Sequence, residues 1–205
     1  MSRVASRQVI ESVGRERSDG WELPGRVHVV CVGNELARDD GVGIRVGELL
    51  GRLGLPEQIT LNFFPELGIG LFDLLTADAK VVVVDALATG GAAGTWRILS
   101  GCEVASHSAR PVACHTFGIA ELLAIAEARS GRHCVEDVAL VGIEVADIEG
   151  FSTRLSEAVH AALPGVLEAV MRLLDAPEAV IAEARALAES TPREMPLRTL
   201  QNERG

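Results

Sequence analysis

The chain has 205 residues, of which 48% are hydrophobic, and this size predicts a single domain with a sizeable core. Its formal net charge of -10 argues against general affinity for nucleic acids, which depends on clustered Lys and Arg side chains. No apolar run approaches the roughly 20 residues that a membrane-spanning helix needs. The polar N-terminal segment lacks the pattern of a secretory signal. We therefore expect a cytoplasmic protein that binds neither nucleic acid nor membrane.

The four cysteines form no C-x-x-C pair, which argues against the zinc-ribbon and thioredoxin classes. Cys31 lies in an apolar run and is most simply a small buried hydrophobe. Cys114 stands beside His115, and a Cys–His nucleophile is conceivable there. Adjacent residues usually point apart, however, and this argues against such a pair.

A strand, an acidic loop and a helix follow one another between residues 27 and 50. The apolar run 27–32 has the length of a buried strand, and Gly33 breaks it, as glycine does at turns. Two adjacent carboxylates follow, Asp39 and Asp40. Beyond them apolar residues recur at helical spacing, which predicts a helix.

Two interpretations of this acidic loop stay open on the residues alone. Loops at the carboxyl edge of a parallel sheet bind ligands in α/β proteins, and neighbouring carboxylates attract a cation and repel phosphate. The loop would then bind a metal or act as a general acid or base. Alternatively, Asp39 or Asp40 only caps the helix, because the helix dipole favours a carboxylate there.

A second acidic strand end follows in the middle of the chain. Residues 59–64 are rich in β-branched and aromatic side chains and predict a strand, which a short helix follows at 71–75. The valine run 81–84 is typical of a strand that is covered on both faces. Asp85 ends this run, where a carboxylate is costly unless it is paired or lies at the sheet edge. We interpret Asp85 as functional rather than as a turn or cap residue, since sites collect at strand ends.

A histidine precedes the next predicted helix. Residues 95–99 predict a short strand at the sheet edge, and 100–112 read as irregular. His115 then stands just before a helix that stops near Gly131. A single His is usually structural or exposed, but this one is expected at the same edge as the two acidic loops.

The last third of the chain predicts a further strand at 138–143 and a long helix. Ser152 is placed to cap this helix, and Pro164 should kink or divide it. The chain as a whole divides into three predicted segments: a flexible N-terminal arm over 1–24, a single α/β domain over 25–175, and a helical or disordered extension over 176–205.

Strands that alternate with helices predict an α/β fold. We expect a three-layer sandwich whose mostly parallel central sheet has about five strands, with helices on both faces. Right-handed crossovers would gather Asp40, Asp85 and His115 at one edge. Two carboxylates and an imidazole suit a borderline divalent cation such as nickel or zinc, with coordination positions left for water or substrate.

These segments resemble the hydrogenase maturation endopeptidases over about residues 27–174. VGNELARDDGVGIRV is similar to the family's G-N-x-L-x-x-D-[DE]-G-x-G-x-x-V signature, and LGIGLFDLL to its Gly-containing turn and short helix. VVVVDAL resembles its strand ending in Asp-Ala, HTFGIAELLAIA its His-x-x-Gly helix start, and VALVGIE its last strand. The chain departs from the family at Cys31, where Gly is usual, and at Asp40, where some members have Glu.

The resemblance implies a cytoplasmic protease that cleaves a C-terminal extension from the precursor of a nickel–iron hydrogenase large subunit, after nickel insertion. The family's metal contacts correspond to Asp40, Asp85 and His115. The implied metal is nickel carried by the substrate, without a permanent cofactor, and nothing requires more than a monomer. The metal could polarise a carbonyl or activate water, or the two carboxylates could share a proton, as in aspartic peptidases.

Two rival functions are considered beside this one. A non-catalytic, metal-dependent chaperone or binding module for a metalloenzyme subunit would use the same residues and leave its partner's length unchanged. A nucleotide-binding α/β enzyme is disfavoured, because Cys31 stands where a G-x-G-x-x-G turn needs its first glycine.

Overall fold

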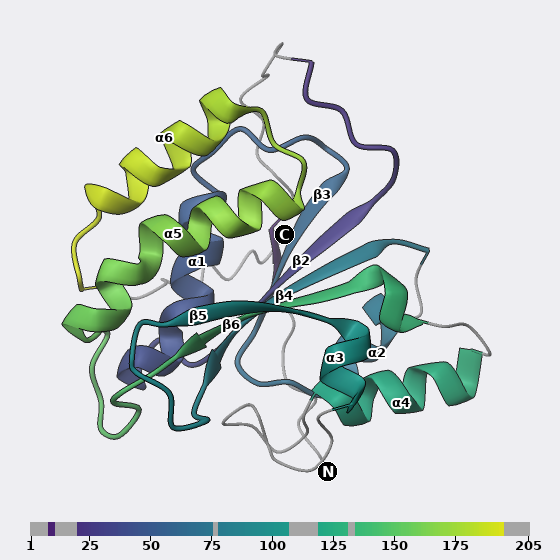
Figure 1. Cartoon of the computed structure of the whole chain (residues 1–205), viewed down its shortest axis with the longest axis horizontal. Coiled ribbons are helices and arrows are strands. Elements are labelled where there is room, and N and C mark those ends of the chain that lie inside the picture. The colour runs from purple at the N-terminus through teal and green to yellow at the C-terminus, as the bar shows by residue number, and fades with distance from the viewer. Residues whose placement is uncertain (1–7, 11–19, 76–77, 107–118, 131–133, 195–205) are drawn as a thin grey trace, which may run out of the picture.

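The computed structural model describes residues 8–10, 20–75, 78–106, 119–130 and 134–194 (Figure 1). A six-stranded sheet with the order β1-β3-β2-β4-β6-β5 forms its centre. The four central strands are parallel, whereas β1 and β5 pair antiparallel at the two edges. The mostly parallel sheet is therefore confirmed, with one strand more than expected. The strands are β1 (Gln8–Ile10), β2 (Val27–Val32), β3 (Ile59–Phe64), β4 (Lys80–Leu87), β5 (Trp96–Ser100) and β6 (Val138–Glu144).

Helices cover both faces of the sheet, as the three-layer prediction requires (Figure 1). One face carries α1 (Val42–Leu50), α5 (Glu157–Leu173) and α6 (Glu178–Glu189), and the other carries α2 (Ile69–Leu75), α3 (Gly101–Ser106) and α4 (Ile119–Ser130). Successive strand residues serve opposite faces, so Val82 packs in the first core and Val83 in the second. Covering on both sides explains the unbroken valine run. None of the helices among the described residues combines the length and apolarity that crossing a bilayer demands.

The sheet continues further in sequence than predicted at two places. β4 runs on to Leu87 by pairing with β6, so Asp85 lies inside the strand instead of ending it. Within the segment predicted to be a flexible arm, β1 pairs with β3, and Trp21 is buried with its indole N–H donating to the carbonyl of Leu174 at 3.1 Å. These residues are held by partners distant in sequence.

Two predictions about helices need correction. The first part of the segment predicted to be irregular forms α3, where the carboxylate of Glu103 accepts from the backbone N–H of Ser100 at 2.7 Å. Ser156 caps α5 in place of Ser152, which pairs its backbone with the acidic loop. Pro164 lies inside α5 without dividing it.

The extension after residue 175 forms α6 in its described part and packs along α5. Four of its side chains are buried in the same core as α1 and the sheet: Val180, Ile181, Ala184 and Ala188. Beyond α6, the carbonyl of Pro192 accepts from the guanidinium of Arg45, a buried residue of α1, at 3.0 Å. Part of the extension therefore belongs to the core.

Candidate active site

Asp40 and Asp85, two of the three site residues predicted from sequence, come from the carboxyl ends of two neighbouring parallel strands. β2 and β4 pair in register, with Cys31 opposite Val84, so the loop after β2 and Asp85 of β4 lie at the same edge. The 3-10 helix η1 (Arg38–Gly41), which carries Asp40, packs against β4. Gly43 allows the chain to approach both strands, because a Cβ there would stand 2.2 Å from the carbonyl oxygen of Val32 in β2 and 2.5 Å from that of Val84 in β4.

Gly33 makes the turn that directs the loop back over the end of β2. Its φ of 138° lies in the region that L side chains rarely adopt. A Cβ on Gly33 would also stand 1.9 Å from the backbone oxygen of Asp40. Glycine at this position is therefore required both by the turn and by the close approach of Asp40.

Asp40 has one carboxylate oxygen that is paired and one that is not. Only 6% of the residue is exposed. Its Oδ2 accepts from the backbone N–H of Asn34 at 2.8 Å, whereas Oδ1 is buried without a hydrogen-bond partner among the residues that the structure describes. Burying an unpaired carboxylate oxygen is costly. An unpaired carboxylate oxygen of this kind can coordinate a cation that a bound ligand carries.

Asp85 is less exposed than Asp40 and lies at the same edge of the sheet. The position of His115 is not described. Asp85 is 1% exposed, and its Oδ1 accepts from the backbone N–H of Ala86 at 2.8 Å. His115, like Cys114, lies outside the described residues. The residues that the structure describes contain no group of three or more His, Cys, Asp or Glu side chains that could hold a metal. Two members of the predicted trio thus share one edge, and the trio itself stays a prediction.

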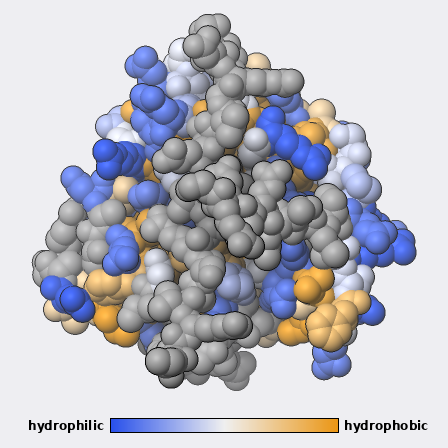
Figure 2. All heavy atoms as spheres, turned by 180° about the vertical axis from the view of Figure 1, so that it is seen from behind, coloured by the Kyte–Doolittle hydropathy of each residue, from blue (hydrophilic) through white to orange (hydrophobic). Residues whose placement is uncertain are grey.

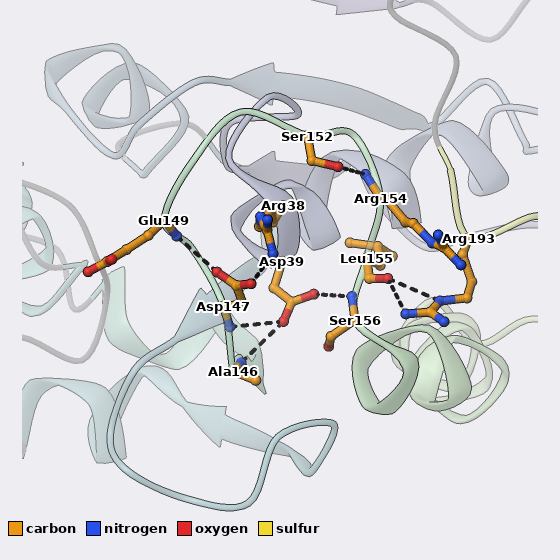
Figure 3. Close-up of polar contacts among 10 residues, drawn as sticks. All are labelled: Arg38, Asp39, Ala146, Asp147, Glu149, Ser152, Arg154, Leu155, Ser156 and Arg193. Atoms are coloured by element: carbon orange, nitrogen blue, oxygen red, sulfur yellow. Dashed lines mark hydrogen bonds and ion pairs between the residues drawn. The ribbon is translucent and has the colours of Figure 1, made fainter.

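Asp39 has a role that differs from that of Asp40 and that the sequence did not reveal. The N-cap of α1 is Gly41, and no side chain caps it, so the capping interpretation is wrong for both acids. Asp39 is fully buried and accepts three backbone hydrogen bonds, from Ser156 at 2.6 Å and from Ala146 and Asp147 at 3.2 Å (Figure 3). It therefore ties the loop between β6 and α5 to η1.

Further contacts join the same two loops. The guanidinium of Arg38 forms an ion pair with Asp147 (Figure 3), and its backbone N–H donates to the carbonyl of Ser152 at 2.9 Å. The backbone N–H of Ser152 donates in turn to the carbonyl of Leu36 at 2.9 Å. The only sequence signal for this arrangement is the adjacency of two acids on a tight turn, where neighbouring side chains point in different directions.

A further buried carboxylate, Glu144, lies at the end of β6. Thr89 donates to it through its backbone N–H at 3.1 Å and through its hydroxyl, and Arg97 donates at 2.8 Å. Burial alone would raise the pKa of Glu144, but the hydrogen bonds from Thr89 and the charge of Arg97 bring that pKa below its ordinary value. Glu144 is thus a satisfied anion that fixes the loop after β4.

Comparisons with known proteins agree with the geometry. A family model described as hydrogenase maturation protease matches residues 46–173. The hydrogenase expression/formation protein HoxM of Azotobacter vinelandii is 32% identical over 159 residues, which cover 77% of this chain and 75% of that protein. HupM of Azotobacter chroococcum mcd 1 is 32% identical over 168 residues, covering 81% and 75%. The hydrogenase maturating endopeptidase HybD from E. coli superposes with a TM-score of 0.64 at 26% identity, covering 73% and 92%.

Proposed function

Because the chain belongs to the family of hydrogenase maturation proteases, we propose that it removes the C-terminal extension from the precursor of a nickel–iron hydrogenase large subunit, after nickel has been inserted. Its enzyme class, peptide hydrolase, follows from the family. The substrate, its nickel and the timing are parts of the proposal. We further propose that the protein acts in the cytoplasm as a monomer and needs no permanent cofactor.

The observation that carries this proposal is Oδ1 of Asp40, which is buried without a hydrogen-bond partner among the residues that the structure describes. Asp40, Asp85 and His115 would hold the nickel ion that the precursor carries, and this contact would distinguish a loaded precursor from an empty one. Oxygen and imidazole ligands suit nickel. The bonds from Asn34 and Ala86 hold one oxygen of each carboxylate and so orient it.

The same residues supply a chemistry for peptide hydrolysis. Nickel in the substrate could polarise the scissile carbonyl or activate water, and a carboxylate could then move the proton. Alternatively, the two carboxylates share a proton, as in aspartic peptidases. Both routes need Asp40 and Asp85 at one edge of the sheet.

The test is the intact mass of a nickel-loaded precursor after incubation with the protein. We expect the wild type to shorten it and Asp40→Asn, Asp85→Asn and His115→Ala to leave it uncut. Glu57→Gln is the matched control, because Glu57 is an exposed carboxylate before β3, at the opposite edge of the sheet. Undiminished cleavage by all three variants would discard the site.

A second part of the experiment distinguishes the proposed protease from a non-catalytic chaperone. A precursor without nickel should stay uncut, since the metal is the feature recognised. A wild-type protein that binds the loaded precursor and leaves its mass unchanged would favour the non-catalytic chaperone.

A further inference from the structure

Two apolar side chains are exposed beside the loop that carries Asp40. Phe151 is 93% exposed and Leu36 is 39% exposed. They belong to the two loops that pair through Ser152, whose backbone N–H donates to the carbonyl of Leu36. Phe151 and Leu36 therefore flank one backbone contact, and together they are called the Leu36–Phe151 surface.

The loop that carries Phe151 is held in place. Asp39 binds its two ends, at Ala146 and Ser156, and Gly150 makes the turn before Phe151 with a φ of 87° (Figure 3). An aromatic ring exposed on a held loop is available to a partner, and covering it would remove apolar area from water. Aromatic side chains are enriched among the residues that dominate protein–protein binding.

Hydrogen bonds connect this surface to the candidate catalytic carboxylate. The backbone N–H of Leu36 donates to Oδ1 of Asn34 at 3.0 Å, and the backbone N–H of Asn34 donates to Oδ2 of Asp40 at 2.8 Å. A partner seated on Leu36 is thus seated at a fixed position relative to Asp40.

The charges around the surface are acidic. Glu149, two positions before Phe151, is exposed and forms no ion pair with any residue that the structure describes. Glu35, next to Leu36 in the chain, is partly exposed, with its Oε2 buried. Arg38 is already paired with Asp147, and Arg154 is directed toward Arg193, on the side away from Glu149 (Figure 3). A complementary partner would present an apolar area bordered by Lys or Arg side chains.

Phe151 is the most exposed of the large hydrophobic side chains that the structure describes. Figure 1 draws the loop between β6 and α5 at the lower left, and Figure 2, the view from behind, shows hydrophobic atoms exposed at the corresponding lower right. We propose that the Leu36–Phe151 surface docks the folded precursor, through an apolar area of that protein bordered by basic side chains, and so sets the scissile segment at Asp40. This inference rests on the proposed function.

The test compares the steady-state processing of nickel-loaded precursor by the wild type, Phe151→Ser and Leu36→Ser. We expect KM to rise about tenfold for Phe151→Ser, because truncating a binding hot spot has an effect of this size. The value of kcat should stay within about twofold, since neither side chain touches the reacting atoms. Ile125→Ser on α4, whose side chain is 50% exposed, is the matched control and should keep the wild-type KM.

The outcomes separate the two proposals. Wild-type cleavage together with an unchanged KM for Phe151→Ser overturns the docking surface and leaves the proposed function standing. A wild type that never shortens the precursor overturns the proposed function, and the docking surface with it. A wild-type dimer that Phe151→Ser turns into a monomer in sedimentation would assign the surface to a second copy of the chain, and would also overturn the proposal.

Discussion

Asp39 and Asp40 are sequence neighbours whose carboxylates do opposite things. Asp39 uses both oxygens to accept backbone N–H groups of another loop, so it serves the structure. Oδ1 of Asp40 has no partner among the described residues, so this oxygen is available to accept a bond from a ligand or to coordinate a cation. Active sites commonly keep such unfavourable groups, because the function needs them.

Asp40→Asn should therefore abolish processing without weakening the fold. The amide oxygen can still accept from Asn34, and a neutral group is less costly to bury than an unpaired anion. We expect cleavage to fall at least about a hundredfold, given the losses seen around metal sites. The free energy of unfolding, measured in urea, should fall by less than about 0.5 kcal/mol or rise. Strong destabilisation by Asp40→Asn would assign Asp40 a structural role instead.

Asp39→Asn, in contrast to Asp40→Asn, should lower the free energy of unfolding. An amide has one acceptor oxygen where the carboxylate has two, so at least one of the three backbone N–H groups loses its partner. Each such loss costs about 1–3 kcal/mol. Urea unfolding of Asp39→Asn beside Asp40→Asn makes a matched pair, and equal stability of the two variants would contradict the division of roles.

At the residue scale, the sequence could place Asp40 and Asp85 at one edge of the sheet, because the apolar runs before them form neighbouring parallel strands. Their roles stay predictions. The sequence could not predict the role of Asp39. The backbone groups that Asp39 binds begin 107 positions later in the chain, and local pattern carries no information on such a contact.

At the scale of elements, α1 lies close to the sheet because two small residues face each other. A Cβ added at Gly47 of α1 would stand 2.5 Å from Sγ of Cys31 in β2 and 2.5 Å from Cε1 of Phe63 in β3. Cys31 is fully buried, as its apolar run predicts. The room that its side chain needs is provided by glycine on the helix.

Gly47→Ala should consequently destabilise the protein by about 1–3 kcal/mol, the usual cost of overpacking a core. Adding Cys31→Ala should restore part of this loss, because it removes one of the two clashing atoms and leaves Phe63. A double-mutant cycle in urea measures the coupling. Additive losses would show that Cys31 and Gly47 do not compete for the same space.

The end of β6 makes stability depend on pH through Glu144. A carboxyl whose pKa is lower in the folded than in the unfolded state stabilises the fold above its unfolded pKa, and this contribution is lost as pH falls through the folded pKa. Between about pH 6 and about pH 3, the wild type should lose more unfolding free energy than Glu144→Gln. Parallel losses in the two proteins would contradict the direction of the shift.

The elements that the sequence predicted best are the buried strands, since β-branched runs have few alternatives. The sequence-based predictions were wrong where contacts with a distant segment set the ends of an element. β4 extends past Asp85 because β6 offers backbone partners as far as Glu144. The start of α5 moves to Ser156 because the backbone of Ser152 is taken by the acidic loop.

At the scale of the whole molecule, the C-terminal helix α6 completes the core. Its buried face covers α5 and α1, and the segment after it supplies the Pro192 carbonyl to Arg45. Burial lowers the pKa of Arg45, which Glu48 opposes, so this guanidinium depends on its few partners. Sequence analysis predicted a helical or disordered extension and not its place in the core, because an Ala- and Glu-rich helix has a weak apolar face.

Ending the chain after residue 176 should lower the melting temperature substantially. The deletion exposes core side chains that α6 covers and removes Val180 and Ile181, whose burial alone stabilises by about 3 kcal/mol or more. For a chain of this size such a loss corresponds to roughly 6–12 °C. Circular dichroism during heating checks this, and a truncated protein that melts with the full chain would contradict it.

The account depends on two acids and an imidazole meeting a divalent ion at one edge of the sheet. Anomalous diffraction at the nickel edge, from crystals of the protein grown with nickel, tests this most directly. The account predicts one nickel peak within about 2.2 Å of Oδ1 of Asp40, of a carboxylate oxygen of Asp85 and of a ring nitrogen of His115. A nickel ion bound by other residues, with Oδ1 of Asp40 turned away from it, would contradict the account.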